Sequence, residues 1–224
     1  AYVKDILCQK NGFKVLLENG DTFKADKVII AAGGKAMPST GSDGNGFELA
    51  KKLGHTVTDI FPALVQLKLE GGFFKQIEGV KFVGTAELLH QNKSIAKDRG
   101  DILFGNYGVS GPPIFQISRK AGELLQKGEL PVLKITIMDQ MTKEDMQKLL
   151  MIRFANQPKK TIEFSLVGLI NKRLIPVLLK EAGISDLKLP AGNVSKKDCE
   201  KIANILVDWR FNVRGTKSWP SAQV

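Results

Sequence analysis

The chain has 224 residues, of which 43% are hydrophobic and 25% charged, a balance that excludes an intrinsically disordered or low-complexity protein. Its 33 lysines and arginines exceed its 23 acids and give a net charge of +10, which allows either RNA phosphates as a partner or an ordinary solvated basic surface. No apolar stretch approaches the roughly 18 residues of a membrane span, and the two cysteines are far apart. The sequence therefore predicts a cytoplasmic protein with no membrane partner, no disulfide framework and no metal site.

The first 59 residues contain turn and strand signals. Segments 13–17 and 22–25 flank Asn19-Gly20-Asp21, which predicts a hairpin because Asn and Gly tolerate positive φ. The apolar run from Val28 to Ile30 follows, and its β-branched residues predict a buried parallel strand covered on both faces.

A helix is predicted over 47–53, where Gly54 provides the stop signal. Residues 1–59 are therefore interpreted as the last part of a dinucleotide-binding domain of the α/β type.

From Phe61 onward the pattern changes to short strand-like runs separated by Gly, Asn and charged turns, which indicates a β-barrel or twisted sheet. The runs are 65–69, 85–90, 94–96, 101–104 and 132–138. One helix, predicted over 112–126, interrupts them and has prolines at its start. Residues 60–140 are assigned to the barrel domain.

Helical signals dominate residues 141–208. Thr142 and Ser195 each have a carboxylate three residues later, which is close to a capping box and predicts that a helix begins there. This segment is predicted to be a small all-α insert domain. Alternating residues from 210 to 215 then predict a strand, so 209–224 are assigned to the barrel.

The glycine-rich stretch that follows Ile30 leaves two interpretations open. Gly41, Gly44 and Gly46 form G-x-x-G-x-G, whereas the dinucleotide fingerprint is G-x-G-x-x-G directly after its strand. The spacing alone allows either an ordinary Gly-rich connection or a cofactor edge at the carboxyl end of a strand.

The residue sequence of this stretch favours the cofactor edge. Residues 31–55 read A-A-G-G-K-x-x-P-x-T-G-S-D-G-x-G-F-x-L-A-K-K-L-G-H, which resembles A-T-G-G-x-S-x-P-x-T-G-S-x-G-x-G-Y-x-L-A-x-x-L-G-H of a bacterial family, the BaiN-type NAD(P)/FAD-dependent oxidoreductases. Residues 61–67 are similar to the family's P-A-L-V-P-L strand, and residues 100–114 to its G-E-x-L-F-T-x-x-G-x-S-G-P-x-I motif. The chain departs from the family at Ala32, Gln66 and Gly105, where relatives carry Thr, Pro and Thr.

The resemblance implies an α+β, multi-domain architecture: the edge of a FAD-binding domain, a β-barrel and an all-α insert. It also implies that the chain is an internal fragment, missing N- and C-terminal parts of the same protein and inactive alone. The cofactors implied are FAD and, as possible donor, NAD(P)H. The implied cofactor-binding residues are Ala32, Gly33, Gly34, Ser42, Asp43, Gly44, Asn45 and Gly46.

No catalytic residue is assigned, because His55 and His90 are the only histidines and neither has a partner at a triad or ligand spacing. In a flavoprotein the cofactor supplies the reactive atoms. Two functions stay open: part of an oxidoreductase that moves hydride between NAD(P)H, flavin and an unsaturated substrate, or a basic RNA-binding module such as the rRNA-docking part of a dihydrouridine synthase. The substrate, a small molecule or rRNA, is undecided.

Overall fold

The computed structural model describes residues 1–223, and these form two compact units. The first unit runs from Ala1 to Pro62 and includes the C-terminal residues from Ser218 onward. The second unit spans Ala63–Lys217. Each unit is described by itself below.

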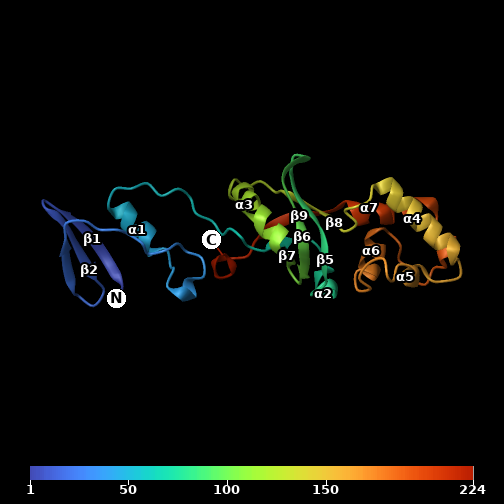
Figure 1. Cartoon of the computed structure of the whole chain (residues 1–224), viewed down its shortest axis with the longest axis horizontal. Coiled ribbons are helices and arrows are strands. Elements are labelled where there is room, and N and C mark those ends of the chain that lie inside the picture. The colour runs from blue at the N-terminus through green and yellow to red at the C-terminus, as the bar shows by residue number, and fades with distance from the viewer. Residues whose placement is uncertain (224) are drawn as a thin grey trace. The chain divides into compact units, whose positions relative to one another are not determined.

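The first unit contains a three-stranded antiparallel sheet in the order β1 (Val3–Gln9), β2 (Gly12–Leu17) and β3 (Thr22–Ala25) (Figure 1). The predicted hairpin is confirmed: Gly20 has a φ of 93°, and the amide of Leu17 donates to the Asp21 carbonyl at 2.9 Å. The predicted helix is also confirmed as α1 (Asn45–Lys52), which begins two residues earlier than expected. Short 3-10 turns, η1 (Pro38–Thr40) and η3 (Trp219–Ser221), complete this unit.

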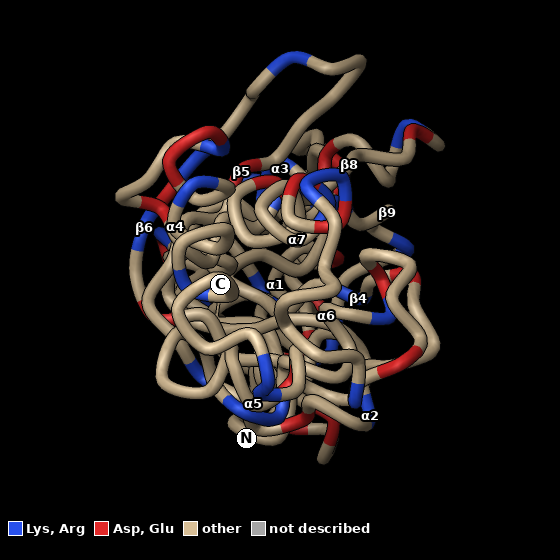
Figure 2. Tube along the Cα trace, turned by 90° about the vertical axis from the view of Figure 1, so that its right-hand side faces the viewer, with Lys and Arg blue, Asp and Glu red and all other residues tan. Residues whose placement is uncertain are grey.

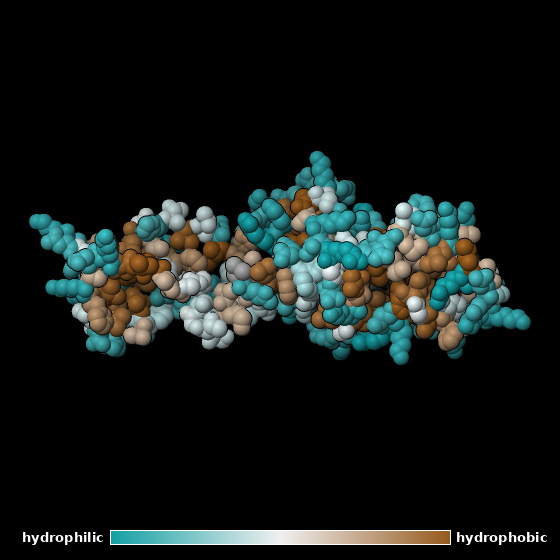
Figure 3. All heavy atoms as spheres, viewed as in Figure 1, coloured by the Kyte–Doolittle hydropathy of each residue, from teal (hydrophilic) through white to brown (hydrophobic). Residues whose placement is uncertain are grey.

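The predicted strand from Val28 to Ile30 is wrong. The segment from Asp26 to Gly34 forms no strand, and the Ile29 side chain is 91% exposed. A parallel strand needs a neighbour that supplies hydrogen bonds along its edge, and no described residue does so for this segment. The apolar run is therefore unpaired, and Figure 3 shows hydrophobic residues on the visible face of this unit.

The second unit is built on a closed barrel with the strand order β4-β7-β6-β5-β8-β9, and every neighbouring pair is antiparallel. The strands are β4 (Leu67–Leu69), β5 (Lys81–His90), β6 (Lys93–Gly105), β7 (Gly108–Ser110), β8 (Val132–Thr136) and β9 (Trp209–Thr216). Closure removes the exposed edges that an open sheet would present. The predicted α+β class with a barrel and a helical insert is confirmed.

Aromatic and aliphatic side chains fill the barrel. The rings of Phe74 and Phe104 are tilted against each other with centroids 6.2 Å apart, and the ring centroids of Trp209 and Phe211 are 4.9 Å apart. Two helices, α2 (Phe74–Ile77) and α3 (Pro112–Gln126), pack on the strands, and α3 has the bounds predicted from the sequence. Buried residues of α3 such as Ile114 join the same core.

The helical insert comprises α4 (Lys143–Asn156), α5 (Ile162–Ser165), α6 (Ile175–Glu181), the 3-10 turn η2 (Ala191–Asn193) and α7 (Lys196–Val207). Both predicted caps are confirmed: Thr142 Oγ1 accepts from the Asp145 amide, and Ser195 Oγ accepts from the Asp198 amide, each at 3.1 Å. The apolar faces of these helices belong to one core cluster with the barrel.

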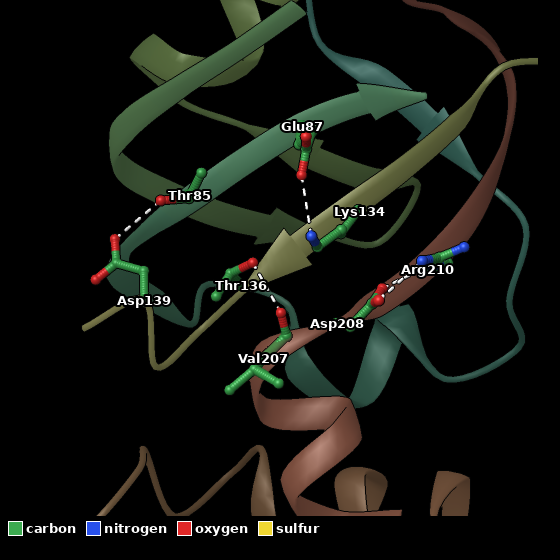
Figure 4. A network of polar contacts seen from close by, with 8 residues as sticks. All are labelled: Thr85, Glu87, Lys134, Thr136, Asp139, Val207, Asp208 and Arg210. Carbon is green, nitrogen blue, oxygen red and sulfur yellow. Dashed lines mark hydrogen bonds and ion pairs between the residues drawn. The ribbon is translucent and has the colours of Figure 1, made fainter. Parts of the chain in front are cut away.

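Polar contacts fasten the insert to the barrel where β8 ends and β9 begins (Figure 4). Thr136 Oγ1 donates to the Val207 carbonyl at 2.9 Å, and the amide of Ile137 donates to the Leu206 carbonyl at 2.9 Å. On the adjacent strands Lys134 Nζ lies 3.0 Å from a carboxylate oxygen of Glu87. The segment that leaves the barrel after β8 and the segment that returns to it before β9 are therefore hydrogen-bonded to each other.

Within residues 1–223, no helix has the length and apolar character needed to cross a membrane.

Candidate functional site

The structure brings the predicted cofactor-binding residues together in the first unit. The amide of Gly44 donates to the Gly34 carbonyl at 3.1 Å, which joins the stretch after Ile30 to the start of α1. A Cβ on Gly46 would lie 3.1 Å from the Cβ of Ala32, and a Cβ on Gly33 would lie 3.0 Å from Ser42 Oγ. Segments 32–34 and 42–46 therefore contact each other, and glycine is what permits the approach.

Backbone donors are free on one side of this contact. The amides of Ala32, Gly33 and Gly34 donate to no acceptor in the described part of the chain. Gly34 is open, since an added Cβ would meet no atom within 4 Å. Unpaired backbone N–H groups beside a helix start suit an anionic or electron-rich ligand.

Asp43 and Asn45 are engaged within the unit. Asp43 accepts from the Asn45 amide at 2.9 Å and from the Tyr2 hydroxyl at 3.0 Å. These two hydrogen bonds, the Asn45 amide first, lower the pKa of Asp43, while the bond to the carboxylate raises the pKa of Tyr2. Asn45 also donates through Nδ2 to the Val3 carbonyl at 2.9 Å, so both side chains fix the loop against β1.

A cavity of about 300 Å³ adjoins the same loop. Its walls come from β1, β2, the unpaired segment 28–32 and α1, and they are mainly apolar, with Asp43 and Asn45 at the rim. The apolar lining residues include Ile6, Val15, Val28, Ile30 and Leu49. An apolar hollow with a few convergent polar groups is the usual form of a cofactor site.

These observations fit a dinucleotide cofactor. Three free amides and the open backbone at Gly34 could receive an oxygen-rich group, and the adjoining apolar walls could receive a flat ring. Lys35 instead lies over the Trp219 ring, 5.5 Å from its centroid. The groups that could hold FAD are thus mostly backbone.

Acid–base machinery is sparse. His55 is exposed after the end of α1, and His90, the last residue of β5, has its Nε2 2.5 Å from a Glu129 carboxylate oxygen. No group of three or more His, Cys, Asp or Glu side chains that could hold a metal ion occurs among residues 1–223. His90 and Glu129 thus form an imidazole–carboxylate pair at the end of β5, outside the glycine-rich loop, and residues 1–223 hold no cluster suited to a metal ion.

A second concave site lies on the insert and was missed from the sequence. It occupies about 340 Å³ between the end of α4 and α5, with Arg153, Lys160, Phe164 and Ser165 in its lining. The signal was present as the basic pair Lys159-Lys160 with an aromatic residue four positions after Lys160. The basic pairs looked isolated from aromatic residues along the sequence, and the fold brings this pair against a ring.

The fold defines a barrel protein with a helical insert and, in the first unit, a glycine-rich loop at the start of α1. The chain belongs to the family described as HI0933-like protein barrel and H2TH domain, which matches residues 61–224. This agrees with the predicted resemblance to BaiN-type proteins, which is confirmed.

Three curated relatives extend the comparison. The chain is 32% identical, over 99% of its length and 54% of the relative, to 3-dehydro-bile acid delta(4,6)-reductase of Clostridium scindens. It is 26% identical to ribosomal RNA dihydrouridine synthase of Escherichia coli, over 99% of this chain and 52% of that protein. The Haemophilus influenzae protein of the same name is 24% identical, over 94% of this chain and 49% of that protein. The chain thus spans about half the length of the curated relatives it matches.

Proposed function

We propose that the chain is part of a FAD-dependent oxidoreductase that transfers hydride between NAD(P)H, flavin and an unsaturated substrate. The observation that carries the proposal is the run of unpaired amides at Ala32, Gly33 and Gly34 beside the start of α1. Family membership and the similarity to a reductase support it. The flavin would supply the hydride chemistry, as cofactors do in this class of enzyme.

In this proposal the residues of the chain bind and orient the cofactor. The amides of 32–34 would donate to its polar groups, and the first turn of α1 would offer its N–H groups to an electron-rich part of the cofactor. Ser42, Gly44 and Gly46 keep the two segments close enough for both to contact one ligand. Asp43 and Asn45 hold the loop in shape through their bonds to Tyr2 and β1.

Relatives about twice as long support the further proposal that an active enzyme requires segments beyond this chain. The domain assignment of 1–59, 60–140 with 209–224, and 141–208 is part of the same proposal. The enzyme would act in the cytoplasm.

The test uses the longer polypeptide that carries this sequence, purified beside the 224-residue chain. A flavin absorbance band between about 350 and 500 nm in the longer protein, bleached anaerobically by NADH or NADPH, is the expected result. A longer protein that is colourless and cannot be reconstituted with FAD would overturn the proposal.

Two glycine substitutions test whether FAD binds at the predicted glycine-rich edge. Gly34→Val places a side chain in the open space before the amides, and we expect it to weaken FAD binding at least tenfold. Gly72→Val is the matched control, because Gly72 also has no atom within 4 Å of an added Cβ and lies in the second unit. Equal FAD affinity in the two variants would place the cofactor elsewhere.

A second candidate function is RNA binding, with a base of rRNA as the substrate or the partner. It is favoured by the net charge of +10, by similarity to two ribosomal RNA dihydrouridine synthases and by the exposed aromatic ring beside Lys160 on the insert. The two candidates are compatible, since a flavin enzyme can act on a nucleobase.

A further inference from the structure

The cavity on the insert is lined by groups suited to an anion. Its lining includes Arg153, Asn156, Gln157, Lys160, Phe164 and Ser165, and no carboxylate among the described residues belongs to it. In Figure 2, Lys and Arg positions lie beside the α5 label. Positive groups without an intervening acid make this a site of positive potential.

Ser165 belongs to the lining of this cavity and has a buried hydroxyl that is left without a hydrogen-bond partner among the described residues. The residue is 7% exposed, and its Oγ is buried with no hydrogen-bond partner in residues 1–223. Buried hydroxyls in folded proteins are nearly always paired, because an unpaired one costs stability. A ligand oxygen in the cavity would give this hydroxyl a partner.

Arg153 is fixed and still has donors to offer. Its Nε donates to the Ser165 carbonyl, and its Nη2 donates to the Val167 carbonyl at 2.8 Å. These bonds use two of the five guanidinium N–H groups and hold the plane of the group beside the Ser165 backbone. The remaining N–H groups match the oxygens of a phosphate.

Phe164 and Lys160 supply a flat surface and a second charge. Phe164 is 57% exposed, and the Lys160 ammonium lies over one face of its ring, 4.9 Å from the centroid, so a base would stack on the opposite face. Lys160 makes no ion pair with any described acid. An exposed ring next to free cations is the arrangement on which single-stranded nucleic acids stack their bases.

We propose that this cavity binds single-stranded RNA: a phosphodiester is held by Ser165, Arg153 and Lys160, and a neighbouring base stacks on Phe164. The proposal rests on the second candidate function and names the surface that would carry it. An acidic peptide could use the cations but would gain little from the ring. Paired RNA would have no base free to stack on it.

The test measures binding of a fluorescein-labelled single-stranded RNA of about 12 nucleotides by fluorescence anisotropy at several salt concentrations. We expect Phe164→Leu, which keeps an apolar surface residue, to weaken binding about tenfold. Lys160→Gln should weaken binding severalfold and reduce the salt slope by about one. Lys127→Gln, an equal charge change after α3, is the control and should leave the salt-dependent affinity within about twofold of wild type.

Ser165→Ala separates a ligand-binding role from a structural one. Removing an unpaired buried hydroxyl should leave the thermal midpoint unchanged or raised, whereas RNA affinity should fall severalfold. A purely structural Ser165 would leave RNA affinity unaltered.

The outcomes distinguish the site from the function. If the protein binds RNA tightly and the Phe164, Lys160 and Ser165 variants bind it with wild-type affinity, the proposed RNA site is wrong but the RNA-binding function stands. No RNA binding by either this chain or the longer protein would overturn both. An acidic-peptide site would be identified instead if polyglutamate displaced the labelled RNA as effectively as unlabelled RNA does and Phe164→Leu had no effect.

Discussion

Asp139→Asn tests whether the polar network beside the junction of barrel and insert stabilises the fold. The Asp139 side chain is 9% exposed, and its carboxylate accepts from Arg99 Nε at 2.7 Å and from Arg99 Nη2 at 3.3 Å. It also accepts from Thr85 Oγ1 at 3.0 Å, a contact drawn in Figure 4. Hydrogen bonds to a charged group contribute about 1.5–3 kcal/mol. Because Arg99 is 54% exposed and partly screened, we expect the substitution to lower the free energy of unfolding by about 1–2 kcal/mol.

The same group gives the stability a pH dependence of known sign. Burial raises the pKa of Asp139, but the hydrogen bonds from Arg99 and Thr85 together with the Arg99 charge outweigh it, so the pKa is lowered. The folded-state value is then below the unfolded value of about 3.9, and the stabilisation is present above about pH 4 and lost as the pH falls through the folded value. The stability difference between wild type and Asp139→Asn should therefore shrink on acidification.

The assay is urea unfolding followed by circular dichroism between about pH 3 and pH 7, with Asp101→Asn as control. Asp101 pairs with Lys81 at 2.9 Å on the same barrel, but both side chains are substantially exposed, so its substitution should cost less than about 0.5 kcal/mol. The reasoning is refuted if Asp139→Asn costs no more than Asp101→Asn, or if its effect stays constant down to the lowest pH.

Three further outcomes are expected in the second unit. Gly108→Ala should cost about 3 kcal/mol or more in urea unfolding, because the residue has a φ of 144° and its Cβ would lie 2.8 Å from the Leu69 amide nitrogen. Gly72→Ala, in open space, should cost little. Ser195→Ala should lower the thermal midpoint through loss of about 1 kcal/mol of N-cap stabilisation, with Ser195→Asp retaining it. Leu133→Ala, at a fully buried position, should cost about 2–5 kcal/mol in the same unfolding assay, and a smaller cost would mean that the barrel interior collapses around the gap.

Local chemistry made much of the fold predictable. The start of α3 was predicted correctly because its prolines fix φ in the helical range. The starts of α4 and α7 were predicted correctly because the Thr142 and Ser195 hydroxyls accept from an amide three residues later. The hairpin at Gly20 followed from a turn that only a few residue types can form. Such signals depend on near neighbours in sequence.

Features that depend on distant partners were predicted less well. Two separate runs were predicted within what is one continuous strand, β6, because Lys97 to Gly100 look like a charged turn until β5 pairs along their whole length. The apolar run at Val28 was read as a buried strand, although burial requires covering elements that no described residue provides. The glycine-rich edge could be predicted only from its resemblance to a known family motif. The cavity at Phe164 could not be predicted, because it forms where α4 and α5 meet in three dimensions.

The helical insert leaves and rejoins the barrel at one place. Ile135 on β8 and Trp209 on β9 are direct partners across neighbouring antiparallel strands, so the whole insert occupies the position of a hairpin loop. A change of length within the insert, away from the helices that share the core with the barrel, would leave the strand order and the pairing of β8 with β9 in place. The insert is held by two neighbouring strand ends and by a core shared with the barrel, so it should move less relative to the barrel than a domain attached through a single linker.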